Sequence, residues 1–240
     1  MKDINVNILI SSLIAGLVTG VGALIAIALR EPSSKLVSLT LGFASGIMIG
    51  ISAFSLIPNS IDTGTIVTCI VGFVIGGVFL FLVDIGLPHI HKIESDCGAY
   101  LKMGYFIAIG IAFHNLPEGI AIGASNAISE HLGLMTALAI GLHNIAEGLS
   151  VAVPLRLGRI GKKRIVFITT MTGLSTFFGA GLGMILVNVS QTFISFGMAF
   201  AAGAMIYIAS DELIPHSHSV HSEFANLGIM LGFTAALFLP

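Results

Sequence analysis

The chain alternates between long apolar stretches and short polar interruptions. A helix needs about 20 mostly apolar residues to cross the hydrocarbon core of a bilayer. The pattern predicts eight transmembrane helices, with approximate ranges 5–29, 36–57, 65–87, 103–125, 132–155, 164–187, 191–214 and 223–239. Little chain is left between them, so we expect an all-α integral membrane protein with one polytopic domain over residues 1–240. We expect the first stretch to be retained in the mature protein, because no small-residue cleavage site follows it.

Composition supports a membrane protein and excludes an ordinary soluble domain. Hydrophobic residues make up 55% of the 240 residues and charged residues only 9%, whereas soluble domains carry about 25% charged residues. The mean hydropathy is +1.03. No patch of basic and aromatic residues indicates a nucleic-acid partner. The two cysteines, Cys69 in a predicted span and Cys97 in a loop, are too far apart in this topology for a structural disulfide.

The basic residues predict the orientation. Of the 10 Lys and Arg residues, only Lys2 falls on the side of the membrane that holds the termini. The others fall on the opposite side, namely Arg30, Lys35, Lys92, Lys102, Arg156, Arg159, Lys162, Lys163 and Arg164. Because cytoplasmic loops carry the excess of positive charge, we expect both termini to lie outside the cytoplasm, in a multi-pass protein of the cell inner (plasma) membrane.

An internal repeat relates the second and seventh predicted spans. Residues 43–58 align without gaps to residues 200–215, and both segments end in Leu-Ile-Pro. The two spans cross the membrane in opposite directions, as do the fourth and fifth spans. This pattern is typical of an inverted-topology repeat, an arrangement that recurs in secondary transporters. The sequence therefore predicts three helices, a central pair and three further helices.

A second repeat carries the chemistry. The fourth span contains His-Asn-Leu-Pro-Glu-Gly at 114–119, and the fifth contains His-Asn-Ile-Ala-Glu-Gly at 143–148. A His and a Glu four residues apart share one helix face. The step from Met103 to His114 rises about 16 Å, which places the motifs near the membrane midplane. Four side chains are thus expected to converge, His114, Glu118, His143 and Glu147.

Two imidazoles and two carboxylates form a complete ligand set for a divalent metal ion. Imidazole suits Zn²⁺ and Fe²⁺, and two carboxylates balance a charge of 2+. Metal binding to such a site is expected to release protons. Gly119 and Gly148, which directly follow the two Glu residues, are expected to let the two motif helices approach each other closely.

The paired motifs resemble those of the ZIP family of divalent metal transporters, nearest its bacterial GufA-like branch. The resemblance covers the whole chain. It implies transport of Zn²⁺, and often of Fe²⁺, Mn²⁺ or Cd²⁺, toward the cytoplasm by alternating access, usually in a homodimer in the lipid bilayer. No cofactor is implied, since the metal ion is the transported substrate. The resemblance also implies that helices 1, 4, 5 and 6 form a transport element that slides past a scaffold of helices 2, 3, 7 and 8.

The resemblance assigns the primary metal site to the four motif side chains, with Met48 as a soft ligand beside them. In relatives a second ion is held by an Asn of the fourth span, an acid or Asn after the His of the fifth span, and a Glu of the sixth span. Here these positions are Asn115, Asn144 and Thr176. Because the acid of the sixth span is missing, we expect one high-affinity metal ion.

Acidic and histidine residues close the third and seventh spans on the predicted cytoplasmic side. They form a candidate exit for the metal ion, consisting of Asp84, His89, His91, Asp211, Glu212 and His216. The resemblance supports this role for His89 and His91. His216, His218 and His221 are explained equally well as solvated residues at the interface.

Two other classes of function compete with transport. An intramembrane metalloenzyme would use the same two His and two Glu residues, but neither the Glu-x-x-His motif of di-iron bundles nor the His-Glu-x-x-His motif of zinc proteases occurs. A receptor or structural bundle would bind metal only to fold. The inverted repeat argues against it, because static binding gives that symmetry no purpose. The sequence therefore favours a transporter and not an enzyme.

Overall fold

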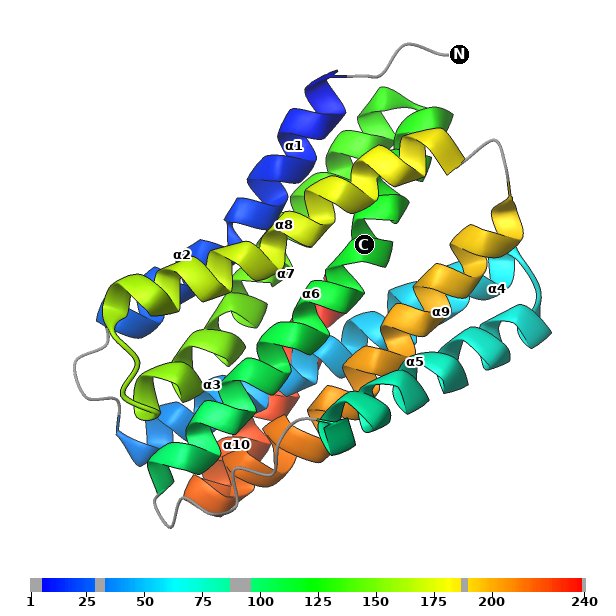
Figure 1. The fold of residues 1–240 in the computed structure, drawn as a ribbon. Coiled ribbons are helices and arrows are strands. Elements are labelled where there is room, and N and C mark those ends of the chain that lie inside the picture. Colours follow the sequence, from blue (N-terminus) through cyan, green and yellow to red (C-terminus); the bar gives the residue numbers. More distant parts are fainter. Residues whose placement is uncertain (1–5, 29–32, 87–95, 187–189, 239–240) are drawn as a thin grey trace.

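The computed structural model is a bundle of α-helices, and it describes residues 6–28, 33–86, 96–186 and 190–238 (Figure 1). The helices are α1 (Val6–Leu17), α2 (Thr19–Ala28), α3 (Ser34–Ile51), α4 (Ile57–Thr63), α5 (Ile66–Gly86), α6 (Asp96–Ile128), α7 (Glu130–Leu157), α8 (Lys162–Leu186), α9 (Gln191–Ile208) and α10 (Ile214–Ala236). Two short π-helical segments, Ser52–Leu56 and Ala209–Leu213, join α3 to α4 and α9 to α10. The described residues therefore confirm the predicted all-α class.

Seven helical stretches of the described chain are long and apolar enough to cross a membrane. Six of them fall on the first six predicted spans. The seventh, Gln191–Ala236, is 46 residues long and covers both the seventh and the eighth predicted spans. The polar segment between these two spans stays helical except at His221, which has an extended backbone with φ −162° and ψ 98°. The fold is that of a multi-pass helical membrane protein.

The first predicted span is interrupted at Val18, which separates α1 from α2. The backbone amide of Val21 donates to the Val18 carbonyl at 2.8 Å, a step of only three residues. The carbonyl of Ala15 accepts a hydrogen bond of 2.9 Å from the side-chain amide of Asn144 on α7. A side-chain donor thus serves a carbonyl beside the break, which allows the helix to be interrupted inside a membrane.

Glycines bring the motif helices into backbone contact with other helices. A Cβ atom on Gly148 of α7 would meet the Thr19 carbonyl of α2, and one on Gly119 of α6 would meet the Thr176 carbonyl of α8. The expectation that these glycines pack α6 against α7 is therefore wrong. Successive helical residues are about 100° apart around the axis, so a glycine that follows an inward-facing Glu lies on a different face from it.

The two segments of the internal repeat share their local structure. Ser33 accepts a hydrogen bond from the Leu36 amide at the start of α3, and Ser190 accepts one from the Phe193 amide at the start of α9. Both helices then end in a π-helical segment that leads into Ile-Pro. The two π-helical segments share only their last residue, a Leu, and begin with Ser52 and Ala209. Sequence similarity is thus accompanied by similar capping and similar irregularity.

Serine pairs connect these helices near both of their ends. The hydroxyls of Ser60 and Ser195 donate to each other's carbonyl oxygen at 2.8 and 2.7 Å, which joins α4 to α9. At the matching positions, the Ser38 hydroxyl donates to the Ser217 carbonyl at 2.8 Å, which joins α3 to α10. The Ser217 hydroxyl donates within its own helix, to the Ile214 carbonyl. The first pair is therefore reciprocal, and the second is a single bond.

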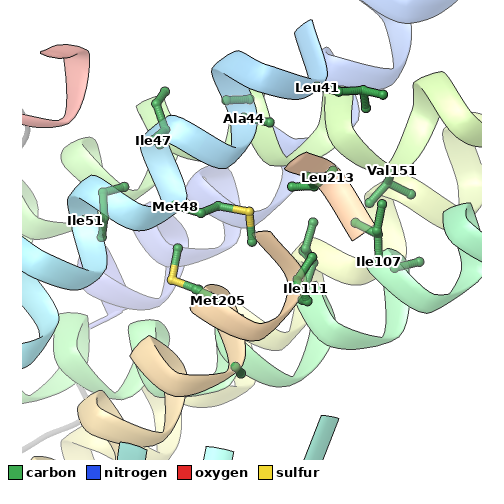
Figure 2. Close-up of a cluster of buried hydrophobic side chains, with 14 of the residues drawn as sticks. Leu41, Ala44, Ile47, Met48, Ile51, Ile107, Ile111, Val151, Met205 and Leu213 are labelled. Atoms are coloured by element: carbon green, nitrogen blue, oxygen red, sulfur yellow. The ribbon is translucent and has the colours of Figure 1, made fainter. Parts of the chain in front are cut away.

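The most extensive helix contacts are those of α3 with α10, of α6 with α8, of α5 with α9 and of α6 with α7. We refer to α1, α2, α6, α7 and α8 as the moving group, and to α3, α4, α5, α9 and α10 as the framework group, after the roles that are proposed for them below. Contacts of α6 with α9 and of α3 with α7 connect the groups. Figure 2 shows apolar side chains at this boundary, namely Leu41, Ala44, Ile47, Met48 and Ile51 with Ile107, Ile111, Val151, Met205 and Leu213. Much of the surface between the groups is therefore apolar.

Candidate metal centre

Helices α6 and α7 position the four motif side chains. His114 and Glu118 lie one turn apart on α6, and His143 and Glu147 lie one turn apart on α7. Both helices run without interruption through the motifs, although α6 contains Pro117. Because residues four apart share a helix face, each helix presents its imidazole and its carboxylate together to the other helix.

The four side chains form a ring in which imidazoles and carboxylates alternate. Nε2 of His114 lies 2.7 Å from Oε1 of Glu147 and 3.9 Å from Oε1 of Glu118. Nε2 of His143 lies 3.0 Å from Oε1 of Glu118 and 3.7 Å from Oε1 of Glu147. A tetrahedral zinc ion places its ligand atoms about 3.3 Å apart. The four separations between His and Glu atoms thus lie on either side of this spacing.

The ring is almost completely shielded from solvent. His114 is 0% exposed, Glu118 2%, His143 4% and Glu147 1%. Ionised carboxylates in such surroundings are stable only when they are paired or bind a cation. The ligand atoms of His114, Glu118 and Glu147 all lie within 4.8 Å of one another. The arrangement is therefore suited to a small cation with a charge of 2+.

The Asn115 amide borders the ring, and its nitrogen is placed as a donor to the carboxylates. The nitrogen donates to Oε2 of Glu147 at 3.1 Å and to Oε2 of Glu118 at 3.2 Å. An amide carries a donor and an acceptor on the same carbon, so this side chain is also able to present an oxygen ligand to a cation.

Asn144 and Thr176 are buried but contribute no charge. The amide nitrogen of Asn144 donates to the Ala15 carbonyl. Its oxygen and the Thr176 hydroxyl have no hydrogen-bond partner within the described part of the chain. They are neutral oxygen atoms near the motif helices, and neither supplies the negative charge that a second divalent ion requires.

Met48 lies on α3, in the framework group. Its side chain is 1% exposed and belongs to the apolar cluster of Figure 2, together with Met205 and with Ile111, which is one turn before His114 on α6. Ser52 donates to the Met48 carbonyl at 2.8 Å and lies 3.8 Å from the Met205 sulfur. A thioether is thus available on the framework side, close to the helix that carries His114.

A second acidic cluster lies at one end of the bundle. Carboxylate oxygens of Asp84 on α5 and of Asp211 and Glu212 in the second π-helical segment lie within 4.8 Å of one another. Lys102 of α6 places its Nζ 3.0 Å from Oδ1 of Asp84. In the sequence, Lys102 contributes only to the charge distribution that predicts the orientation. Its pairing with Asp84 has no spacing signal, because the two residues lie on different helices.

The histidines at and near the predicted exit are less closely joined to this cluster. Nδ1 of His216 lies 3.5 Å from Oε2 of Glu212. Nε2 of His218 lies 3.0 Å from Oδ1 of Asn226, and Nδ1 of His221 lies 4.0 Å from Oε2 of Glu223. The structure thus brings three acids and His216 together and places His218 and His221 with other partners. Two further predicted exit residues lie outside the described residues, His89 and His91.

The fold and the ring together define a multi-pass membrane protein with a buried His and Glu centre. Residues 88–240 match the family model described as ZIP Zinc transporter. The chain is 35% identical over 245 residues to the zinc transporter GufA of Myxococcus xanthus, with 96% of each chain covered. It is 32% identical to the zinc transporter ZupT of Chlorobaculum parvum, covering 92% of this chain and 91% of the relative. The zinc transporter ZIPB of Bordetella bronchiseptica is 37% identical, with 92% and 76% covered.

This chain belongs to the ZIP family. The resemblance read from the paired motifs, including its GufA-like character, is therefore confirmed. Members of this family are transporters and not enzymes, so the intramembrane metalloenzyme is not supported. The bacterial relatives and the apolar helices indicate a multi-pass protein of the inner membrane.

Proposed function

We propose that this protein carries a divalent metal cation across the membrane toward the cytoplasm. Zinc is the first candidate, and Fe²⁺, Mn²⁺ and Cd²⁺ are further candidates. The observation that carries the proposal is the buried ring of two imidazoles and two carboxylates on α6 and α7. Two carboxylates at this depth cost several kcal/mol unless they are paired or bind a cation. Relatives over most of the chain are named zinc transporters.

In this proposal one ion is bound at a time. His114, Glu118, His143 and Glu147 are its ligands, and Asn115 turns its oxygen to the ion when the ion binds. Met48 is a soft ligand that approaches from the framework group. Asn144 lies beside the site and links α7 to α1, because its amide nitrogen donates to the Ala15 carbonyl.

We further propose that the chain crosses the membrane eight times in a three-two-three inverted repeat. The 46-residue stretch would then cross twice, turning at the polar segment around His221, where the backbone is extended. The matching serine caps and π-helical segments of α3 and α9 support the repeat. Alternating access would arise from sliding of the moving group along the apolar boundary of the framework group.

The distribution of Lys and Arg supports an orientation with both termini outside the cytoplasm. The acidic cluster of Asp84, Asp211 and Glu212 would then lie at the cytoplasmic mouth and receive the metal ion that leaves the midplane. We also propose a homodimer, in keeping with the family resemblance. Mass determination of the purified protein in detergent, corrected for bound detergent, would distinguish a dimer from a monomer.

Transport is tested by reconstitution into liposomes. Purified protein should move ⁶⁵Zn²⁺ into the lumen along a concentration gradient. The double variant H143A/E147A should abolish flux, because it removes half of the ring. H218A is the matched control and should retain most of the flux, because His218 pairs with Asn226 away from the ring. If the unmodified protein binds zinc but gives no flux, the transport proposal is refuted.

A further inference from the structure

A lysine reaches from the moving group into the acidic cluster of the framework group. Nζ of Lys102 on α6 lies 3.0 Å from Oδ1 of Asp84 on α5. The Lys102 side chain is only 17% exposed, and that of Asp84 is 25% exposed. Oxygens of Asp211 and Glu212 lie within 4.8 Å of an Asp84 oxygen. The ammonium group thus pairs with Asp84, and the carboxylates of Asp211 and Glu212 converge on the same aspartate.

The charges of this cluster favour a cation. Three carboxylates this close to one another repel, and a positive charge among them relieves the repulsion. The ammonium of Lys102 is a compact point charge on a flexible stem, and therefore a good substitute for a mobile cation. It supplies only one positive charge, so a divalent ion compensates the three acids better.

The same contact crosses the boundary between the two helix groups. Much of that boundary is apolar (Figure 2) and offers little resistance to sliding. Lys102 precedes His114 on α6 by twelve residues, or about 18 Å along the helix. Displacement of α6 along α5 would therefore pull the ammonium away from Asp84.

We propose that Lys102 is a tethered cation, seated in the acidic cluster, that the departing metal ion must displace. This inference rests on the proposed transport function. While the ammonium is seated, it weakens metal binding by the acids and holds α6 to α5. When a metal ion takes its place, the link between the groups is broken. When the ion leaves, the ammonium returns to Asp84. Lys102 is thus a positioning residue that keeps the exit from retaining metal.

A purely structural ion pair is the competing explanation. In both cases, replacing Lys102 by a neutral residue removes an ion pair and lowers stability. Only the tethered cation predicts that the neutral variant binds metal more tightly than the parent protein. Metal affinity at the acidic cluster therefore separates the two explanations, whereas stability does not.

The affinity is best measured in an H143A/E147A background, which disables the midplane ring. Isothermal titration of the purified, monodisperse protein with Zn²⁺ alone should show tighter binding for K102M, by about tenfold or more, because a positive charge next to the ion is removed. K102Q provides a second neutral variant. K102R keeps the charge and should match the parent. K162M is the matched control, since Lys162 is exposed at the start of α8 and its loss changes the net charge equally.

The gain in zinc affinity of K102M must depend on the acids of the cluster. Adding D211N/E212Q to K102M should abolish this gain. Equal affinities for K102M and K162M, or a gain that survives D211N/E212Q, would overturn the role of Lys102. Lack of zinc flux in the unmodified protein would instead refute the proposed transport function, so the two failures are distinguishable. In liposomes, K102M should show a slower maximal zinc flux than K102R, because release from the acids is slower.

Discussion

Each imidazole of the candidate metal centre is closest to the carboxylate of the other helix. His114 pairs with Glu147 and His143 pairs with Glu118, at 2.7 and 3.0 Å. These pairs therefore hold α6 and α7 together. In the proposed function, an entering cation exchanges these hydrogen bonds for metal bonds and displaces the protons that the imidazoles share with the carboxylates. Because the pairs are buried, removal of one member leaves the other without compensation.

Replacing one carboxylate tests this pairing. E147Q should weaken zinc binding by at least about thirtyfold, because loss of one buried charged partner typically costs about 2–5 kcal/mol. Isothermal titration measures the change. E223Q is the control, since the Glu223 side chain is 89% exposed and lies away from the ring. Equal affinities for the two variants would mean that Glu147 is not a ligand.

The number of bound ions tests the proposal that only one ion binds because α8 has Thr176 in place of an acid. Elemental analysis should find one tightly held zinc ion per chain. T176E should add a second ion, because it places a carboxylate where the structure has only a buried hydroxyl. T176V is the control and should stay at one. Two tightly bound ions in the unmodified chain would contradict the single-ion proposal.

At the scale of helices, close backbone contacts hold each motif helix on a face other than the one that carries its His and Glu side chains. Gly148 packs α7 against α2, and Gly119 packs α6 against α8. The Asn144 amide adds a polar link between α7 and the break in the first span. The residues directly after Glu147 and His143 therefore attach α7 to α2 and to α1. Small residues are well suited to this task, because transmembrane helices associate mainly through close packing.

A single methyl group tests this packing. G148A should destabilise the protein by about 1–3 kcal/mol, the usual cost of overpacking, because the new Cβ would meet the Thr19 carbonyl. G181A on α8 is the matched control, since its nearest neighbour atom would be 4.0 Å away. Thermal unfolding in detergent, followed by size-exclusion chromatography, compares the two. Equal melting temperatures of G148A and G181A would show that α2 shifts to accommodate the methyl group without loss of stability.

At the scale of the whole molecule, the sequence predicted features that repeat along one helix. The 3.6-residue period places His114 with Glu118 and His143 with Glu147, and long apolar runs mark the membrane helices. Contacts between distant helices leave no such pattern. The sequence therefore did not reveal the Lys102–Asp84 pair. Nor did it reveal the break at Val18, because the surrounding residues are apolar and an apolar run looks the same whether or not the helix is continuous.

Cysteine labelling tests the orientation and the number of crossings. In a C69S/C97S background, an impermeant maleimide should label D62C and L237C on intact cells. It should label E223C only after the membrane is opened, because we place that residue at the cytoplasmic turn of the 46-residue stretch. Immediate labelling of E223C, or protection of L237C, would rule out eight crossings in the proposed orientation.

The first residues of the two π-helical segments have a consequence for the resting state. If the two repeats were identical, exchanging their conformations would convert an outward-facing molecule into an inward-facing one of equal energy. They are not identical, because Ser52 donates to the Met48 carbonyl, whereas the matching Ala209 has no hydroxyl. The reciprocal Ser60–Ser195 pair is likewise matched by a single bond at the other end. In the proposed cycle these differences make the two end states unequal in population even without metal or a membrane potential.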